Sequence, residues 1–245
     1  MIFEQFNAIT HTTPYRFLKP DVYKVQKKRV YLALSPFSVE TFNIGLFKQT
    51  NILLPDVIER SVHKRQSEYF AGRYLSKILM SLVINQPPQN ILSGEDRAPI
   101  WPSGISGSIS HSNNTVGAIV GLEQNISIVG LDIENILTPT SAKNIKRQIA
   151  IDSEYDVMLS ANHAENIAVT LLFSAKESLY KALFPQVKSF FGFDAAQAIR
   201  CCPQQKIISF KLAPDFCHKY GLNQIYEVYY HQRSTDVITM LLVVK

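Results

Sequence analysis

Two short stretches of this sequence carry three carboxylates and a lysine. The stretch IVGLDIENI holds Asp132 and Glu134, and the stretch FSAKESLYK holds Glu177 and Lys181. Carboxylate oxygens are ligands that Mg²⁺ prefers, alongside water and substrate phosphate. A lysine ammonium binds phosphate oxygens or takes part in proton transfer. The residue types are therefore candidates for a magnesium site that binds a phosphorylated substrate.

The first stretch has the alternation of a β-strand at 126–134. Successive side chains of a strand point to opposite faces, so Gly130, Asp132 and Glu134 share the face opposite an apolar one. Two carboxylates on one face repel each other, and a bound divalent cation would remove that repulsion. Gly130 would leave room for a ligand. The alternative is an ordinary strand surface that faces solvent.

The second stretch reads as part of a helix. Glu177 and Lys181 are four residues apart and so lie on one helix face. Such a pair is also common on helix surfaces, where it contributes about 0.2–0.5 kcal/mol and indicates no function. Only its combination with Asp132 and Glu134 points to a site.

Basic and hydroxyl side chains elsewhere are candidates for binding phosphate oxygens. They occur in three segments, KRQSEYFAGR, RAPIWP and SISHS, and they are Lys64, Arg65, Arg73, Arg97, Ser110 and His111. A structural role for His111 is the alternative to ligand binding. Trp101 is expected to pack in the core or in a pocket.

Composition limits the class of protein. The chain has 245 residues, a length that suffices for one large domain or two small ones. Of these residues, 46% are hydrophobic and 18% are charged. A net charge of +5 suggests an anionic partner, but nucleic-acid binders usually concentrate their charge more. The three cysteines are an odd number, typical of reduced thiols in a cytoplasmic protein. We find no signal peptide, and the apolar run at 237–244 is too short to span a membrane.

The periodicity of apolar residues predicts interspersed helices and strands. The expected helices cover 56–83 and 162–184, the second ending before Pro185, and the expected strands cover 105–111, 115–121, 126–134, 207–212, 224–231 and 236–244. Hairpin turns are expected at 113–114 and 123–125. Without a regular βαβ rhythm, the pattern favours the α+β class.

Taken in order, the motifs R-x-P-x-W-P, S-I-S-H-S, V-G-L-D-I-E and F-S-A-K-E-S-L-Y-K closely resemble those of the 4′-phosphopantetheinyl transferases. The match is to the large single-chain type. The K-E-S form after Phe173, together with KRQSEYFAGR, resembles the subgroup associated with enterobactin-type synthesis. The motifs cover roughly residues 58–184, and each alone is weak, whereas their order and spacing together are specific.

The resemblance implies two similar α+β halves related by a pseudo-twofold axis, with coenzyme A in the cleft between them. The halves would be 1–126, contacting the nucleotide and phosphates, and 127–245, carrying the magnesium site and the carrier-protein docking surface. The phosphopantetheine group of coenzyme A would pass to a serine of an apo acyl- or peptidyl-carrier protein. The other product would be adenosine 3′,5′-bisphosphate. One chain would complete the cleft, so a monomer is expected.

The resemblance also implies roles for single residues. Asp132, Glu134 and Glu177 match the family's magnesium ligands, and Lys181 matches a lysine near the transferring phosphate. Glu177 or a metal-bound water would take the serine proton, with Lys181 assisting. Ser110 and His111 match a pair that contacts the phosphates of coenzyme A, and Lys64, Arg65, Arg73 and Arg97 fall in segments that line the nucleotide pocket.

The segment 138–162 is a candidate docking surface for the acidic helix of a carrier protein. It combines basic Lys143, Lys146 and Arg147 with apolar residues, which are Ile145, Ile149 and Ile151. An ordinary amphipathic surface helix is the alternative.

Two other functions stay open from the residues alone. A magnesium-dependent phosphohydrolase or nuclease would use the same carboxylates, and a non-catalytic module would keep the pocket without the chemistry. Neither G-x-G-x-x-G nor G-x-S-x-G occurs near residues 103–112, which disfavours a dinucleotide-binding fold and a serine hydrolase. The motifs do not distinguish siderophore, polyketide and fatty acid assembly lines.

Overall fold

The computed structural model describes the chain except for residues 1–2, 6–16, 26–27, 85–86 and 95–97. Arg97 therefore lies outside the described residues. The chain divides into two compact units, Met1–Ser127 with Val244–Lys245, and Ile128–Val243. Both contain helices and antiparallel strands, which confirms the predicted α+β class.

The first unit is built on a five-stranded sheet in the order β1-β2-β3-β7-β6, with every neighbouring pair antiparallel. Its strands are β1 (Phe3–Gln5), β2 (Asp21–Val25), β3 (Val30–Pro36), β6 (Ile105–Ser112) and β7 (Thr115–Leu122), and β4 (Leu92–Ser93) pairs with β5 (Pro99–Ile100) separately. Its helices are η1 (Val39–Thr41), α1 (Gly45–Gln49), α2 (Asp56–Glu59) and α3 (His63–Val83). Buried Phe70, Leu75 and Leu79 of α3 share one core with Val116 and Val120 of β7.

The helix predicted over 56–83 is two helices, because the chain is extended at Val62. The side-chain amide of Gln66 donates to the carbonyls of Glu59 and Ser61 at 2.7 and 3.1 Å. These bonds satisfy carbonyls that a continuous helix would have paired internally. Val57 of the first helix and Val62 at this break are 75% and 74% exposed.

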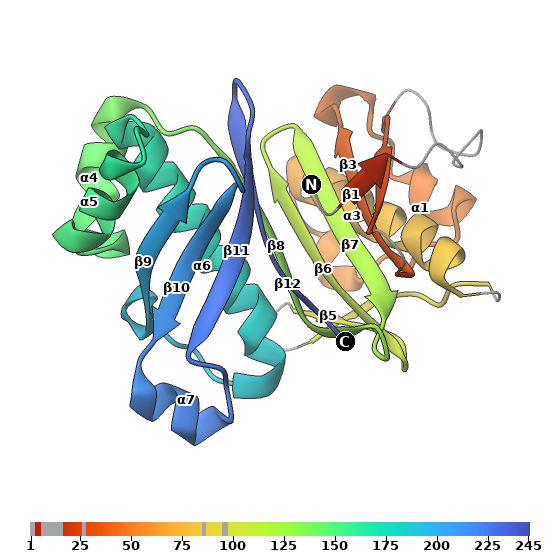
Figure 1. Ribbon diagram of the computed structural model, residues 1–245. Helices are drawn as coiled ribbons and strands as arrows, with labels where there is room; N and C mark the ends of the chain where they lie inside the picture. The colour runs from red at the N-terminus through yellow and green to blue at the C-terminus, as the bar shows by residue number, and fades with distance from the viewer. Residues whose placement is uncertain (1–2, 6–16, 26–27, 85–86, 95–97) are drawn as a thin grey trace. The chain divides into compact units, whose positions relative to one another are not determined.

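The second unit is built on a sheet in the order β8-β12-β11-β10-β9. Its strands are β8 (Ile126–Asn135), β9 (Ala196–Cys202), β10 (Ile207–Leu212), β11 (Ile225–Gln232) and β12 (Asp236–Val244). Its helices are α4 (Pro139–Ile149), α5 (Asp152–Ser160), α6 (Glu165–Val187), η2 (Phe193–Ala195) and α7 (Pro214–Tyr220). Helix α6 runs across one face of this sheet (Figure 1). The helix buries Leu171, Leu172 and Leu179 against Phe210 and Val228 of the strands.

Two local predictions were wrong. The turn at 123–125 does not close a hairpin, because β7 is already paired on both edges, by β3 and by β6, and β8 joins the other sheet. Helix α6 does not end before Pro185 but continues to Val187. A proline so near the C-terminus removes one backbone hydrogen bond, and the continued turn buries Val187 in the core. The hairpin at 113–114 is confirmed.

No helix among the described residues is long and apolar enough to cross a membrane.

Candidate active site

The close packing of α6 on β8 positions the carboxylates. A Cβ atom at Gly130 would lie 2.0 Å from the Ser178 carbonyl oxygen and 2.7 Å from the Ala182 nitrogen. Only glycine therefore lets the helix backbone approach the strand this closely. The sequence-based interpretation of Gly130 was wrong, because the space beside it holds a helix and not a ligand. The consequence is that Glu177 and Lys181 on α6 lie close to Asp132 and Glu134 on β8.

Asp132 lies at the centre of this group and is only 3% exposed. Its Oδ1 is 2.6 Å from the Lys181 ammonium nitrogen, and its Oδ2 accepts a hydrogen bond from Ser174 at 2.8 Å. The Ser174 hydroxyl also lies 2.9 Å from the Thr239 hydroxyl of β12. The alternative of a solvent-facing strand surface is therefore excluded for Asp132, whose carboxylate is buried and held at both oxygens.

The other two carboxylates are half-buried and carry perturbed pKa values. Burial first, and then the negative charge of Asp132, raises the pKa of Glu134 to about 7, although Lys181 acts in the opposite direction. The same causes, in the same order, raise the pKa of Glu177. Three carboxylates thus share one ammonium within a partly buried site. Such a cluster is a suitable place for a further cation.

The chemistry of this donor set fits Mg²⁺, which binds hard oxygen ligands and often takes only a few from protein. In the described parts of the chain, however, no three carboxylate, histidine or cysteine side chains are arranged to hold a metal ion as they stand. The Lys181 ammonium already occupies one oxygen of Asp132. The cluster as it stands therefore does not offer all three carboxylates to a metal ion.

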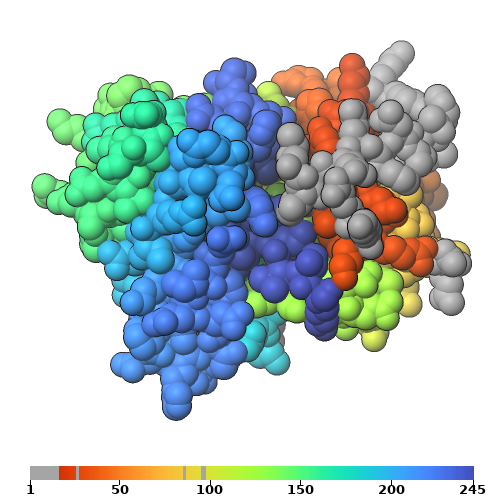
Figure 2. Space-filling view, viewed as in Figure 1, coloured from red at the N-terminus to blue at the C-terminus, as the bar shows by residue number. Residues whose placement is uncertain are grey.

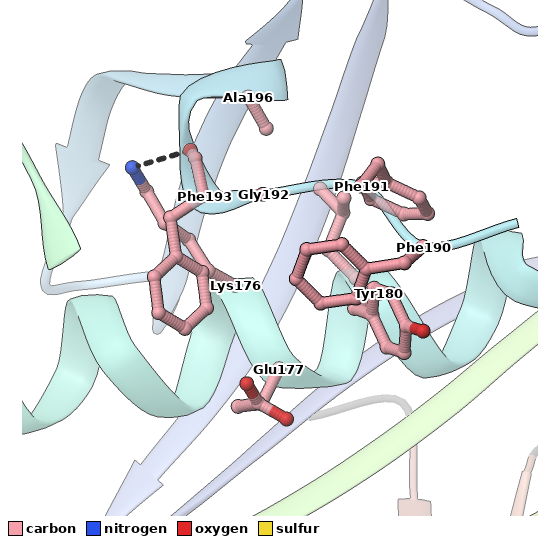
Figure 3. A pocket seen from close by; sticks show the side chains of 9 residues that line it. Lys176, Glu177, Tyr180, Phe190, Phe191, Gly192, Phe193 and Ala196 are labelled. Carbon is pink, nitrogen blue, oxygen red and sulfur yellow. Dashed lines mark hydrogen bonds between the residues drawn. The ribbon is translucent and has the colours of Figure 1, made fainter. Parts of the chain in front are cut away.

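An aromatic pocket begins at Glu177 (Figure 3). Its volume is about 230 Å³. It lies between α6 and the segment that follows this helix, and its lining is Lys176, Glu177, Leu179, Tyr180, Phe190, Phe191, Gly192, Phe193 and Ala196. The rings of Tyr180 and Phe191 are 4.8 Å apart, and Phe190 is 84% exposed. The pocket therefore offers apolar walls with a carboxylate at its edge.

In the first unit, three of the predicted phosphate-binding residues gather around one acidic side chain. Glu68, which is 11% exposed, has Lys64 and Arg65 each at 3.9 Å and the Nδ1 of His111 at 3.8 Å. Arg65 and the Nε2 of His111 are 3.3 Å apart. The side chains of Lys64, Arg65 and His111 form a cluster of cationic and imidazole groups that suits a phosphate.

The remaining predicted residues of this unit are placed differently. Arg73 is 8% exposed, lies 4.7 Å above the Tyr69 ring and donates to Ser93 at 3.1 Å. Its Nε has no hydrogen-bond partner among the residues that the structure describes, and burial lowers its pKa. A Cβ at Gly72 of α3 would touch Ile109, so the odd-numbered side chains of β6, including His111, face α3. Ser110 therefore points to the opposite face of the sheet from His111.

The predicted docking segment forms helices α4 and α5 at the surface of the second unit (Figure 2). Lys143 and Arg147 are exposed, whereas Lys146 pairs with Glu165 at 3.0 Å and lies over the Tyr155 ring. The apolar part of the predicted patch was mostly wrong. Ile149 is 3% exposed and Ile145 packs against the core, which leaves only Ile151 at the surface.

Sequence reasoning missed three residues that shape these sites, Glu68, Ser174 and Lys176, and it missed the aromatic pocket. Glu68 stands four residues after Lys64 and three after Arg65, a spacing that would have revealed it. Ser174 is four residues before Ser178 on the face that meets β8, and its role needed the position of Asp132. The aromatic pocket and the burial of Lys176 depend on the fold of the segment after α6, for which the sequence carried no recognised motif.

Two family models match the chain. Residues 55–121 match the 4′-phosphopantetheinyl transferase N-terminal domain, and residues 128–233 match the 4′-phosphopantetheinyl transferase superfamily. Enterobactin synthase component D of Salmonella typhi is 31% identical over 203 residues, which cover 82% of each chain. This chain belongs to the 4′-phosphopantetheinyl transferase superfamily.

Two further relatives agree with this assignment. Enterobactin synthase component D of Escherichia coli (strain K12) is 29% identical over 213 residues, covering 84% of this chain and 94% of the relative. The 4′-phosphopantetheinyl transferase PptT of Mycobacterium tuberculosis is 34% identical over 142 residues, covering 57% and 60%. The predicted family is thereby confirmed. As a phosphopantetheinyl transferase, the chain is an enzyme that uses coenzyme A as substrate and acts on carrier proteins. The comparisons give no support to a phosphohydrolase or nuclease.

Proposed function

We propose that this transferase uses the carboxylates of β8 and α6 to bind Mg²⁺ and, through it, the pyrophosphate of coenzyme A. The observation that supports this proposal is the clustering of Asp132, Glu134 and Glu177 around the single ammonium of Lys181, with raised pKa values for both glutamates. Mg²⁺, when bound, would offset the negative charge on the leaving phosphate. Asp132, Glu134 and Glu177 would be its protein ligands.

The proton transfer is assigned to the chain's own groups. The acceptor serine must lose its hydroxyl proton as it attacks the phosphorus that bears pantetheine. Glu177 is the proposed base, because it lies at the edge of the pocket and its raised pKa brings its basicity nearer to neutral pH. Lys181, on the same face one turn further, would donate to a phosphate oxygen once its ammonium leaves Asp132.

Lys64, Arg65 and His111 are proposed to bind the phosphates on the adenosine side of coenzyme A, with Arg73, Arg97 and Ser110 as further candidates. The convergence of the first three on Glu68 supports this role, since a phosphate could replace the carboxylate as their anionic partner. Glu68 would keep the three side chains together when no ligand is bound.

The aromatic pocket is proposed to receive the pantetheine arm. This arm is uncharged between its phosphate and its thiol, and the pocket offers four aromatic rings from Tyr180, Phe190, Phe191 and Phe193. Because Glu177 lines the same pocket, an arm placed there would keep its phosphate near the carboxylates.

The exposed basic side chains of α4, Lys143 and Arg147, are proposed to meet the acidic helix of the carrier protein, with Lys146 beside them. We further propose that the enzyme works as a monomer in the cytoplasm, where free thiols such as those of Cys201, Cys202 and Cys217 persist. Siderophore, polyketide and fatty acid assembly lines are the candidate pathways.

Intact mass spectrometry of carrier proteins tests the proposed function. One apo acyl carrier and one apo peptidyl carrier are each incubated with the enzyme, coenzyme A and Mg²⁺. A mass gain of one phosphopantetheine is expected, and it should be absent with EDTA and with Glu177→Gln. Transfer that persists undiminished in EDTA would rule out the metal role. Transfer that persists in Glu177→Gln would rule out the proposed base.

A further inference from the structure

The second unit contains a buried ion pair that the proposed chemistry does not use. The ammonium nitrogen of Lys176 lies 2.9 Å from Oε1 of Glu154, and the two side chains are 2% and 4% exposed. A buried pair of charges is costly to desolvate and is retained only with good geometry and further hydrogen bonds. Lys176 directly precedes Glu177, the proposed base, on α6.

Both partners are fully engaged with backbone groups. The Lys176 ammonium also donates to the carbonyls of Ile149 and Phe193, each at 3.0 Å. Glu154 accepts from the backbone N–H groups of Ile151 and Ala198, at 3.1 and 2.8 Å. The pair thus joins α6 to the end of α4, the start of α5, β9 and the segment that follows α6.

One of these contacts reaches the pocket directly. Phe193 is part of the wall that faces α6 across the pocket, and the bond from Lys176 to its carbonyl is drawn in Figure 3. Phe190, Phe191 and Gly192, which precede it, complete that wall. Lys176 therefore fixes one end of the aromatic wall to the helix that carries Glu177.

We infer that Lys176, held by Glu154, is a positioning residue that keeps the Phe190–Phe193 wall at the correct distance from α6 to accept an uncharged thiol-bearing arm. This inference rests on the proposed function of the pocket. Lys176 would contribute to the affinity for the arm without touching the reacting atoms, and it would have no effect on how the nucleotide part of coenzyme A is bound.

The double variant Lys176→Met, Glu154→Gln tests the inference. It removes both charges at nearly constant volume, a change that is often tolerated in a folded interior, and it removes the bond to the Phe193 carbonyl. Isothermal titration should show the Kd of coenzyme A raised about tenfold, which corresponds to 1.4 kcal/mol. The Kd of adenosine 3′,5′-bisphosphate, which lacks the arm, should change less than about twofold, a difference of roughly 0.4 kcal/mol.

A matched control separates positioning from general destabilisation. Arg233 and Asp236 form another ion pair in the same unit, and Arg233→Met, Asp236→Asn should lower the Tm without changing either Kd. Equal weakening of both ligands by the Lys176 double variant, or a lower Tm with both Kd values unchanged, would overturn the inference.

If the double variant does not fold, the single variant Lys176→Arg tests the inference instead. It keeps the charge beside Glu154 but moves the donors away from the Phe193 carbonyl, so selective weakening of coenzyme A is again expected. Unchanged binding of both ligands would overturn the inference. If the wild-type enzyme binds adenosine 3′,5′-bisphosphate as tightly as coenzyme A, the arm has no site in the pocket, and this inference fails even where carrier modification succeeds.

Discussion

The ammonium of Lys181 lies 2.6 Å from Oδ1 of Asp132, the most buried of the three clustered carboxylates. This contact places the lysine charge where the proposed Mg²⁺ would bind. In the proposed mechanism, lysine and metal would compete for the same oxygen. The ion pair would hold the carboxylates together before the substrate arrives, and its release would free the ammonium for a phosphate.

Removing the Lys181 charge should tighten metal binding while it weakens catalysis. In Lys181→Met, the Kd for Mn²⁺ measured by electron paramagnetic resonance without coenzyme A should fall about tenfold, equivalent to about 1.4 kcal/mol. Transfer to the carrier should decrease at the same time, because the phosphate loses its ammonium. Lys188→Met, at the end of the same helix, serves as the control and should change neither quantity. Weaker Mn²⁺ binding in Lys181→Met would contradict the competition.

Gly130→Ala should disrupt the site by displacing a helix. The added Cβ would meet backbone atoms of Ser178 and Ala182, which cannot rotate away as a side chain can. We expect a loss of about 1–3 kcal/mol in the free energy of unfolding, measured by urea denaturation, and loss of most transfer activity. Gly94→Ala is the control, since its Cβ would meet the nearest atom at an ordinary 3.5 Å. Normal stability and activity of Gly130→Ala would contradict this prediction, because they would show that α6 can move away from β8 without loss of the site.

The carboxylate cluster should make the metal-free enzyme less stable as pH rises. The pKa of Glu134 is about 7 in the folded protein, above its ordinary value of 4.5, and the pKa of Glu177 is raised too. The folded state therefore binds more protons than the unfolded state between these values, so the free energy of unfolding falls as pH increases through that window. Both side chains are only half-buried, which limits the effect to about 1 kcal/mol.

Thermal unfolding in EDTA between pH 5 and pH 8 measures this slope. Glu134→Gln should remove most of it, because an amide does not titrate. Saturating Mg²⁺ should also flatten it by stabilising the ionised carboxylates. A slope that survives Glu134→Gln unchanged would mean that other groups cause it.

Charge reversal on α4 should affect the carrier protein and leave coenzyme A alone. The double variant Lys143→Glu, Arg147→Glu is suitable because both side chains are exposed, whereas Lys146 is tied to Glu165 and Tyr155. The KM for an acyl or peptidyl carrier should rise about tenfold at low salt, and less at high salt, while the KM for coenzyme A stays constant. Lys211→Glu on β10 is an exposed control. A parallel rise in both KM values would refute docking at α4.

The sequence revealed the side chains of the candidate site better than it revealed the packing that holds them in place. Alternation along the strand placed Asp132 and Glu134 on one face, and helical spacing placed Glu177 and Lys181 on another, which local periodicity can establish. Local periodicity could not show that Asp132 is buried against α6. This burial depends on the close approach of Gly130 to the backbone of Ser178, which lies far away in the sequence. The ion pair of Lys176 with Glu154 spans four other segments, and no local pattern encodes it.

The same inability of local patterns to reveal contacts between distant segments explains the errors in the predicted fold. Short-range alternation and turn residues predicted strands at 105–111 and 115–121, each one residue shorter than the observed β6 and β7. These local signals could not predict that β8 belongs to a second sheet, because this depends on β3 occupying the free edge of β7. Gln66 likewise ends one helix and supports the start of the next through carbonyls five and seven residues back, a contact that the propensity of the segment does not reveal.

The position of β12 has a consequence for the order of events during synthesis. In the sheet of the second unit, β12 lies between β8 and β11, and its Thr239 contacts the serine that holds Asp132. The ribosome makes β8 long before β12, so the carboxylate strand emerges without its sheet neighbour. Closing so large a loop is slow, and an unpaired strand edge invites aggregation. The carboxylate strand therefore has no β12 edge to pair with until nearly the whole chain has been made.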